Sequence, residues 1–302
     1  MKWNIYSKLW VIFFVLMGAA CTNQVEDAIP LSDQPIEFAV QSDWKEIPNT
    51  RLNDGRDHFD PNDTIQVFGF HRSSSGDEVK FMYRVGEPAR GQKVVFDGKA
   101  WIYSPKRFWP KEGKLDFYAS YPQFSVLNDE ENHKMTYEQT VNPLQLDLLW
   151  GVSPDHNCAK DSIKNVVINM KHALAKVIIR FDESSLGNIK QAVVSAYQKG
   201  YFSQTDSLGI PIWNVDTTSI QTATLLPYQT QTTIGDATVF ILPDKITKLI
   251  LTTLDGKEID ASDKIKNLNL KFKAGKLYDL KISQKKNTKT RSIAMSVRCV
   301  SE

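Results

Sequence analysis

Residues 115–122 read Leu-Asp-Phe-Tyr-Ala-Ser-Tyr-Pro, and this octapeptide shows the pattern that recurs through most of the chain. Its first, third, fifth and seventh residues are the apolar or aromatic Leu115, Phe117, Ala119 and Tyr121. Because successive side chains of a strand point to opposite faces, these four residues share one face of a predicted strand. Pro122 has no backbone N–H to give to a neighbouring strand, so the strand is expected to end there.

Turn signals separate further strands of this kind. Residues 94–103 predict a hairpin, because Asp97-Gly98 accepts the positive φ angles of a type I′ turn. Asp255-Gly256, which follows the β-rich run 246–253, predicts a second hairpin. Strands about ten residues apart, with turns between them, are typical of antiparallel β-sandwiches. No stretch of ten or more residues shows a convincing helical period, so the chain is predicted to be all-β.

The N-terminus resembles a bacterial lipoprotein leader. Lys2 and Lys8 give the chain a positively charged start. An unbroken apolar run follows at residues 9–20, and Cys21 comes directly after it. Twelve apolar residues are too few to span a bilayer core of roughly 30 Å, so the run indicates an export signal. The thiol of Cys21 is the expected lipid acceptor. The prediction is a signal peptide over residues 1–20 and a lipid-anchored bacterial envelope protein that begins at Cys21.

The remaining 282 residues (302 minus 20) suit two domains. We predict a tether over residues 21–35, an N-terminal β-sandwich over 36–160 and a C-terminal β-sandwich over 161–302. After removal of the two leader lysines, the chain has 35 basic residues (37 minus 2) and 35 acidic ones. This balance gives no long-range field to attract nucleic acid, so no nucleic-acid partner is predicted.

Catalytic and metal-binding patterns were not found. The five histidines form no zinc-type or HExxH spacing, and neither a nucleophile elbow nor a glycine-rich phosphate loop is present. His172 lies in an apolar run and is predicted to be a core residue. The acidic loop 54–63 is predicted to be solvated rather than a calcium site. The sequence therefore predicts no enzyme activity, no metal and no cofactor.

Two features leave alternatives open. Cys158 and Cys299 could form a disulfide in an oxidising envelope, or remain ordinary thiols. The aromatic residues between Trp101 and Tyr121 could form a carbohydrate platform, or pack in the core. Burial of Trp101 and Trp109 would favour the core, whereas exposed coplanar rings would favour sugar binding.

Four segments in order resemble the fimbrillin family of Bacteroides-type bacteria. They are residues 101–122 (with Trp-Ile-Tyr, Phe-Trp-Pro and Leu-Asp-Phe-Tyr-Ala-Ser-Tyr-Pro), 147–151 (Asp-Leu-Leu-Trp-Gly), 167–177 (with Lys-His-Ala-Leu-Ala-Lys-Val) and 274–280 (Ala-Gly-Lys-Leu-Tyr-Asp-Leu). The resemblance implies two transthyretin-like β-sandwich domains with Greek-key connections. It also implies a surface protein held on the outer membrane by its lipid anchor, which acts as a fimbrial subunit or anchor in adhesion, with other fimbrillin-like subunits as partners.

The resemblance further implies assembly by strand exchange. In stalk subunits of the family, an arginine-specific protease removes the lipidated segment with the first strand, and a strand of the next subunit fills the groove. Arg51 is the first cleavage candidate and Arg56 the second; both can equally be ordinary loop residues. Residues 291–300 are either the donor strand or the last strand of the second domain. The alternative function is a glycan-binding surface lipoprotein of a polysaccharide-uptake system.

Overall fold

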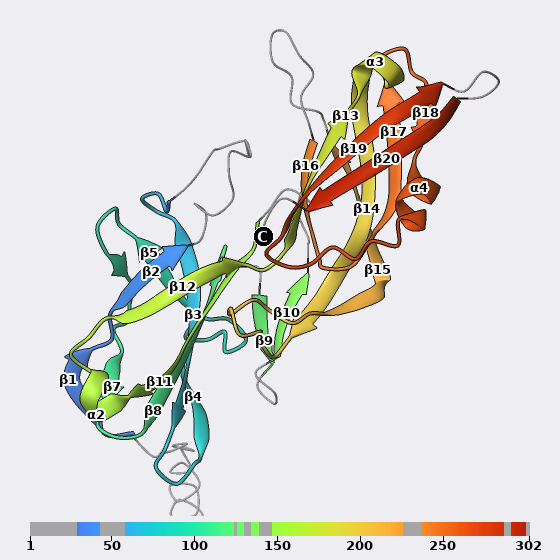
Figure 1. The fold of residues 1–302 in the computed structure, drawn as a ribbon. Helices are drawn as coiled ribbons and strands as arrows, with labels where there is room; N and C mark the ends of the chain where they lie inside the picture. The colour runs from blue at the N-terminus through green and yellow to red at the C-terminus, as the bar shows by residue number, and fades with distance from the viewer. Residues whose placement is uncertain are drawn as a thin grey trace, which may run out of the picture.

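The computed structural model describes residues 29–42, 58–123, 126–129, 134–138, 147–225, 237–286 and 291–299. These residues are mainly β, as the alternation predicts. The helices among them are short: α2 (Cys158–Asp161), α3 (Glu183–Leu186) and α4 (Ser262–Asn267). Figure 1 shows an elongated molecule in which two groups of strands lie end to end. Cys21, Arg51 and Arg56 lie outside the described residues.

Seven strands close into a ring in the N-terminal group. In order around the ring they are β3 (Thr64–Arg72), β5 (Gln92–Phe96), β6 (Trp101–Ile102), β2 (Phe38–Ser42), β12 (Val166–His172), β11 (Leu149–Asn157) and β8 (Lys114–Tyr121). Strand β8 pairs with β3 as well as with β11, and this second pairing closes the ring. Strand β4 (Glu78–Met82) extends from β3, while β1 (Leu31–Pro35) pairs separately with β7 (Phe108–Pro110).

The local predictions for this group are confirmed. Strands β5 and β6 form the predicted hairpin, with Phe96 opposite Trp101 and Gly98 at a φ of 96° between them. Strand β8 ends at Tyr121, directly before Pro122. Leu115, Phe117 and Ala119 of its inward face are fully buried. Alternation and turn chemistry therefore set the strand ends here.

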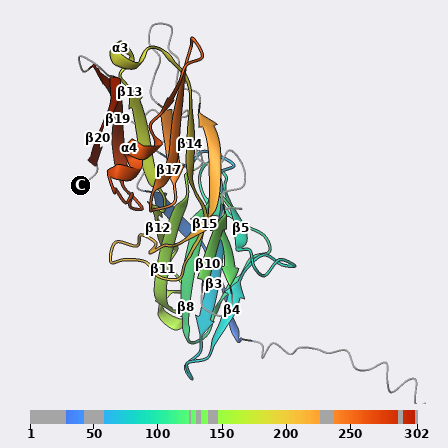
Figure 2. The same cartoon turned by 90° about the vertical axis from the view of Figure 1, so that its right-hand side faces the viewer.

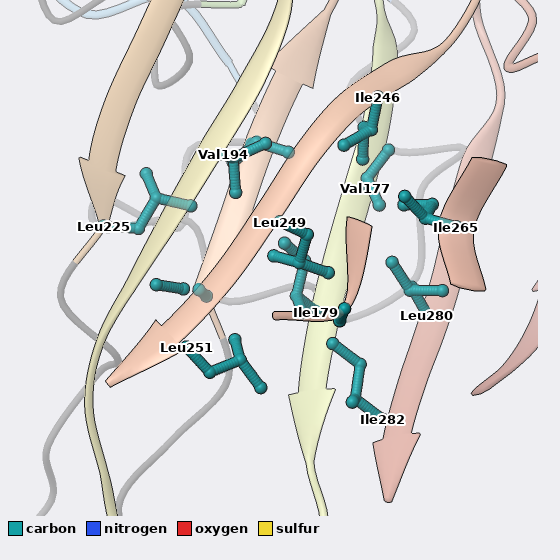
Figure 3. Packing of buried hydrophobic residues seen from close by; sticks show 14 of the residues in the cluster. Val177, Ile179, Val194, Leu225, Ile246, Leu249, Leu251, Ile265, Leu280 and Ile282 are labelled. Carbon is teal, nitrogen blue, oxygen red and sulfur yellow. The ribbon is translucent and has the colours of Figure 1, made fainter. Parts of the chain in front are cut away.

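Two sheets form the C-terminal group. The first contains β18 (Glu258–Asp260), β17 (Ile246–Thr253), β14 (Ile189–Phe202), β10 (Lys134–Glu138) and β9 (Val126–Asp129), with β15 (Asn214–Leu225) also paired to β14. The second contains β16 (Ala237–Ile241), β13 (Ala175–Phe181), β19 (Leu277–Lys286) and β20 (Arg291–Cys299). Their facing side chains form one buried apolar cluster, in which Val177 and Leu280 lie opposite Val194 and Leu249 (Figure 3).

The expectation of purely antiparallel sheets is wrong at two places. Strand β2 runs parallel to β12, and β13 runs parallel to β19. Each pair joins segments that lie about a hundred residues or more apart in the chain. Local alternation specifies which face of a strand is buried but not the direction of a distant partner, so the sequence pattern could not distinguish these cases.

Sheet membership also differs from the predicted domain limits. Strand β12 belongs to the N-terminal ring, so the predicted boundary between residues 160 and 161 runs through that ring. Strands β9 and β10, which fall within the predicted N-terminal domain, pair into the sheet of β14. Strand β1 occupies the last five residues of the predicted tether. The sheets therefore change over at Ala173 and Leu174, the two residues between β12 and β13.

A third buried cluster joins the two groups of strands. Trp150 from the ring and Phe202 from β14 meet with ring centroids 4.9 Å apart, and Ala173 and Leu174 are buried beside them. The indole N–H of Trp213 donates to the carbonyl oxygen of Ala173 at 2.8 Å. These contacts enclose the two-residue connection in a packed core. Among the described residues, no helix is both long and apolar enough to cross a membrane.

Candidate functional site at the N-terminal strand

Strand β2 is the part of the ring on which the predicted assembly chemistry depends. It lies parallel to β12, from Phe38 beside Val166 to Ser42 beside Met170. On its other side it meets β6, where Phe38 is opposite Trp101. The backbone N–H of Val166 donates to the carbonyl oxygen of Glu37 at 2.7 Å. Strand β2 is thus an internal strand, with neighbours on both edges, although it comes from the start of the described chain (Figure 1).

The inward side chains of this segment are part of the ring's core. Ile36 is fully buried, Phe38 is 4% exposed, and Val40 packs against the same cluster. The Phe38 ring lies 5.8 Å from that of Tyr103 and 5.5 Å from that of Phe117, the latter edge-on, centroid to centroid. Aromatic pairs with this separation and tilt are favourable beyond the area they bury. Residues 36–40 therefore fill a defined apolar slot.

A buried tyrosine fixes the backbone at the entrance to the slot. The Tyr103 hydroxyl donates to the carbonyl oxygen of Ile36 at 2.7 Å, and the backbone N–H of Ile36 donates to the carbonyl oxygen of Arg107 at 2.8 Å. Burial raises the pKa of Tyr103 to about 12, because ionisation in an apolar setting is unfavourable. The hydroxyl consequently remains a donor across the physiological pH range.

Strand β1 attaches the preceding residues to the outside of the ring. Leu31 is opposite Pro110 and Pro35 is opposite Phe108 of β7. The backbone N–H of Lys111 donates to the carbonyl oxygen of Pro30 at 2.7 Å. In contrast to Ile36 and Phe38, Leu31 is 45% exposed. Strand β1 is therefore a surface attachment, and β2 is the element that contributes to the core.

Four of the aromatic residues singled out in the sequence, Trp101, Tyr103, Trp109 and Phe117, belong to the same buried cluster as Phe38. Trp101 is 7% exposed and Trp109 is fully buried. Trp101 meets Phe59 edge-on at 5.0 Å, and Trp109 meets Phe117 edge-on at 6.2 Å, between centroids. Rings that are buried and mutually perpendicular cannot present flat faces to a sugar. The core alternative is therefore the one that the geometry favours.

The other candidate residues from the sequence are buried or hydrogen-bonded within the fold. His172 is 6% exposed, and its Nδ1 lies 2.7 Å from Oδ2 of Asp147, which places it in the core as predicted. Cys158 is a buried free thiol, and burial raises its pKa to about 12.

Of the acidic loop, Asp54 and Asp57 lie outside the described residues, and the backbone N–H of Asp60 donates to Oδ2 of Asp63 at 2.8 Å. Within the described ranges, no three His, Cys, Asp or Glu side chains gather as metal ligands would.

The C-terminal segment, residues 291–299, forms β20. It pairs antiparallel with β19, from Tyr278 opposite Cys299 to Lys286 opposite Arg291, and lies at the edge of its sheet. Ile293, Met295 and Val297 pack against the C-terminal core but remain partly exposed. In the single chain this segment is therefore the last strand of the C-terminal sheet, one of the two predicted alternatives.

Sequence reasoning did not foresee the role of Tyr103. Its hydroxyl partner, Ile36, is 67 residues away in the chain. No local motif encodes a contact across that separation. The Trp-Ile-Tyr run did indicate that this segment is aromatic-rich, but only closure of the ring brings it against the N-terminal strand.

These observations define a mainly β protein whose first core strand lies between two neighbours from much later in the chain. The model of the fimbrillin-like family matches residues 50–297, and the chain belongs to this family. The family comprises structural proteins of fimbriae and cell adhesion, not enzymes, and acts at the cell surface. The predicted family resemblance is confirmed.

Solved structures with a similar fold come from two species of Bacteroides. A candidate cell adhesion protein from Bacteroides uniformis is 15% identical, with a TM-score of 0.55, and the match covers 88% of this chain and 98% of that one. A second, from Bacteroides ovatus, is 14% identical, with a TM-score of 0.51 and coverage of 88% and 97%. A comparison with curated proteins gave no match. At these identities the likeness shows the fold alone.

Proposed function

We propose that this chain is a lipid-anchored surface protein of the fimbrillin type, a fimbrial subunit or anchor, and that β2 is its exchangeable strand. The observation that carries the proposal is the position of β2. It is the first core strand of the chain, yet its neighbours in the ring are β6 and β12. Cys21 is the proposed lipidated residue, and other fimbrillin-like subunits are the proposed partners. We also propose that its two groups of strands are related to transthyretin-like β-sandwich domains with Greek-key connections.

Cleavage at Arg51 or Arg56 would separate β1 and β2 from the rest of the chain. Both arginines follow β2 and precede β3, which begins at Thr64. After such a cut, the fragment would be held by non-covalent contacts alone: the backbone pairing of β1 and β2, the packing of Ile36, Phe38 and Val40, and the hydrogen bond from Tyr103. Its departure would leave unpaired N–H and C=O groups on β6 and β12 beside an apolar slot. A replacement strand satisfies both the backbone groups and the apolar surface.

Strand β20 has the pattern that such a slot requires. Ile36, Phe38 and Val40 recur at every second position of the resident segment, and Ile293, Met295 and Val297 do so in β20. As an edge strand, β20 has one partner, β19, whereas β2 has two. Leaving β19 therefore frees β20 from its only neighbour in the sheet, along a ladder of nine paired positions. We propose β20 of one copy as the donor to the ring of the next, a contact that repeats head to tail and so extends as an open filament.

An uncleaved chain would have a different role. With β2 retained, the ring stays closed and the lipid on Cys21 stays attached, as an anchor subunit requires. The glycan-binding alternative receives no specific support, because Trp101 and Trp109 are buried rather than displayed.

The N-terminus of the protein on intact cells tests the proposal. Mass spectrometry of the surface fraction should find either a lipidated Cys21 or a chain that begins at Leu52 or Asp57. The first result identifies an anchor, and the second a polymerising subunit. An unmodified Cys21 in a protein retained inside the cell would refute the surface assignment. The double variant Arg51→Ala, Arg56→Ala is the matched control, and it should abolish any shortened form.

Strand exchange is tested separately with a peptide. The full chain is first cut by an arginine-specific protease, the protease is then inhibited, and excess peptide with the sequence of residues 291–299 is added. The peptide should displace the N-terminal fragment and remain bound to the cut chain. The same peptide with Met295→Asp places a charge in the slot and should not bind. Equal binding of both peptides would contradict the proposed fit.

A further inference from the structure

Strand β15 forms a long edge of the six-stranded sheet. It pairs with β14 from Asn214 opposite Tyr201 to Leu225 opposite Ala192. Among the described residues, no strand other than β14 pairs with it. Figures 1 and 2 both show β15 along the outer margin of the molecule. Alternate backbone N–H and C=O groups on its far side therefore face outward, in the arrangement that can accept another strand.

Charge and length together separate this edge from the others, because the edge strand β16 also lacks charge and proline but has only five residues, against twelve in β15. Edge strands normally resist pairing through charged side chains, prolines or bulges. The β18, β4 and β20 edges carry such charges: Glu258 and Asp260, Glu78 and Lys80, and Arg291 and Arg298, respectively. Residues 219–225 of β15 contain neither a charged residue nor proline. Strand β15 thus lacks the usual protection along half its length.

A bulge limits the unprotected stretch at one end. Asp216 is opposite Lys199 and Ile220 is opposite Tyr197, so three residues of β15 face a single residue of β14. The Asp216 carboxylate accepts hydrogen bonds from the backbone N–H and the hydroxyl of Thr218, at 2.9 and 2.6 Å, which fixes this turn of the backbone. Regular pairing therefore resumes at Ile220 and runs to the end of β15 at Leu225.

The two faces of this stretch are fixed by packing. Ala223 and Leu225 point into the C-terminal core. Ile220, Thr222 and Thr224 lie on the opposite face, where Ile220 is 50% exposed. The Thr222 and Ser195 hydroxyl oxygens are 2.7 Å apart across the strand pair. Packing therefore fixes which side chains of this edge face the core and which face solvent.

We propose that this edge pairs antiparallel with the same edge of a second copy, with a two-fold axis at Thr222. Directly opposed residues of an antiparallel pair share a face, and Thr222 is the middle one of the three outward residues, Ile220, Thr222 and Thr224, of the regular stretch 220–225. Thr222 then lies opposite Thr222 of the second copy, and Ile220 lies opposite Thr224. The pair brings no like charges together, covers the exposed Ile220, and uses one patch on both copies, as a two-fold contact requires.

The contact is a lateral one and is independent of strand exchange. It uses the edge of the six-stranded sheet, whereas β2 and β20 belong to other sheets. One strand edge buries little surface, so the dimer should be weak and populated at high local concentration, as on a crowded cell surface. Failure of this contact leaves the proposed function intact, because the N-terminal measurement and the peptide experiment do not depend on it.

Directed cross-linking tests the register. In the full chain, purified in detergent, Thr222→Cys is oxidised with copper phenanthroline at roughly 100 µM protein, a concentration suited to weak contacts. Residue 222 meets itself at the axis, where the opposed α-carbons are within disulfide range. The matched control is Thr224→Cys, on the same strand and face. Its two copies lie four residues apart along the pair, roughly 14 Å at 3.4 Å per residue, too far for a disulfide.

A covalent dimer that forms at least tenfold faster with Thr222→Cys than with Thr224→Cys is the expected result. The unsubstituted chain is oxidised in parallel, as a control for any cross-linking through the native cysteines. Equal rates for the two variants, or no dimer from either, would overturn the proposal. Thr222→Lys provides a second measurement, because it places two ammonium groups at the axis. This variant should sediment as a monomer at concentrations where the unsubstituted chain dimerises, with an unchanged melting temperature to show that it folds.

Discussion

Replacing Phe38 with alanine tests whether β2 is a structural part of the ring. The side chain is 4% exposed and lies between the rings of Tyr103 and Phe117. Its truncation removes a buried aromatic ring and leaves a cavity in a core whose walls are strands paired on both sides. Such changes cost about 3–5 kcal/mol, because the lost transfer free energy and the cavity add. A loss at the upper end is expected, since neighbouring strands of a closed ring cannot move together freely.

The assay is guanidinium unfolding followed by tryptophan fluorescence, to which Trp101 and Trp109 near the slot contribute together with the other tryptophans of the chain. The matched control is Glu37→Ala, one residue away on the exposed face of the same segment, and it should change the free energy of unfolding by less than about 0.5 kcal/mol. Because the two groups of strands share a core, unfolding need not be two-state, and the transition reported by these tryptophans is the one to compare.

A second readout ties the result to assembly. An arginine-specific protease should release the N-terminal fragment faster from the cut Phe38→Ala chain than from the cut unsubstituted chain. If Phe38→Ala were no more destabilising than Glu37→Ala, β2 would not be packed in the ring. The argument that its removal opens a slot would then fail.

Four further outcomes follow from single contacts. Tyr103→Phe removes the hydroxyl bond to Ile36 and should lower the free energy of unfolding by about 0.5–1.5 kcal/mol in the same denaturation assay. Trp150→Ala empties the core between the two groups of strands and should cost about 3–5 kcal/mol, with an increase in the radius of gyration measured by X-ray scattering. The Cys158 thiol, whose pKa burial raises to about 12, should resist Ellman's reagent in the native protein and react once the chain unfolds. Burial lowers the pKa of His156, so the folded chain binds its proton less tightly than the unfolded chain, and stability should fall as pH drops below about 6.5 towards the lowered folded value.

Each of these outcomes has a contrary result. A Tyr103→Phe chain as stable as the original would mean that the hydroxyl bond is not a net stabiliser. An unchanged radius of gyration and stability in Trp150→Ala would show that the junction is not held by packing. Labelling of native Cys158 at the rate of an exposed thiol would contradict its burial. For the pH effect, His156→Gln should flatten the dependence of the denaturation midpoint between about pH 5 and 7.5, and an unaltered slope would assign it to other groups.

Prediction from the sequence succeeded where the signal is local. The Asp97-Gly98 hairpin and the end of β8 before Pro122 depend on turn geometry and on a missing N–H, both properties of a few adjacent residues. Burial of Trp101 and Trp109 was one of two predicted alternatives and needed the structure to decide it. Local signals did not indicate that β9 and β10 pair with each other and that β10 then joins the sheet of β14, because that second pairing joins residues about sixty positions apart.

The sequence predicted only part of the candidate site. Alternation over residues 36–40 indicated a strand with one apolar face, and four ordered segments indicated the family. The slot itself depends on three distant pieces: Tyr103 bonding to Ile36, β12 beside β2, and β6 on the other edge. Many pairings would bury the same apolar face, and loop-closure entropy changes only slowly with loop length, so it selects weakly among distant partners.

The sequence by itself determined the β class, the positions of the turns, the family and the residues that must be buried. Those properties follow from side-chain periodicity and backbone chemistry, which act over a few residues. Only the tertiary structure decided that the N-terminal sheet closes, that β2 enters it parallel to β12, and that β15 remains an uncharged edge. These depend on which strands meet, and that choice is made by the packing of all the faces together rather than by any one strand.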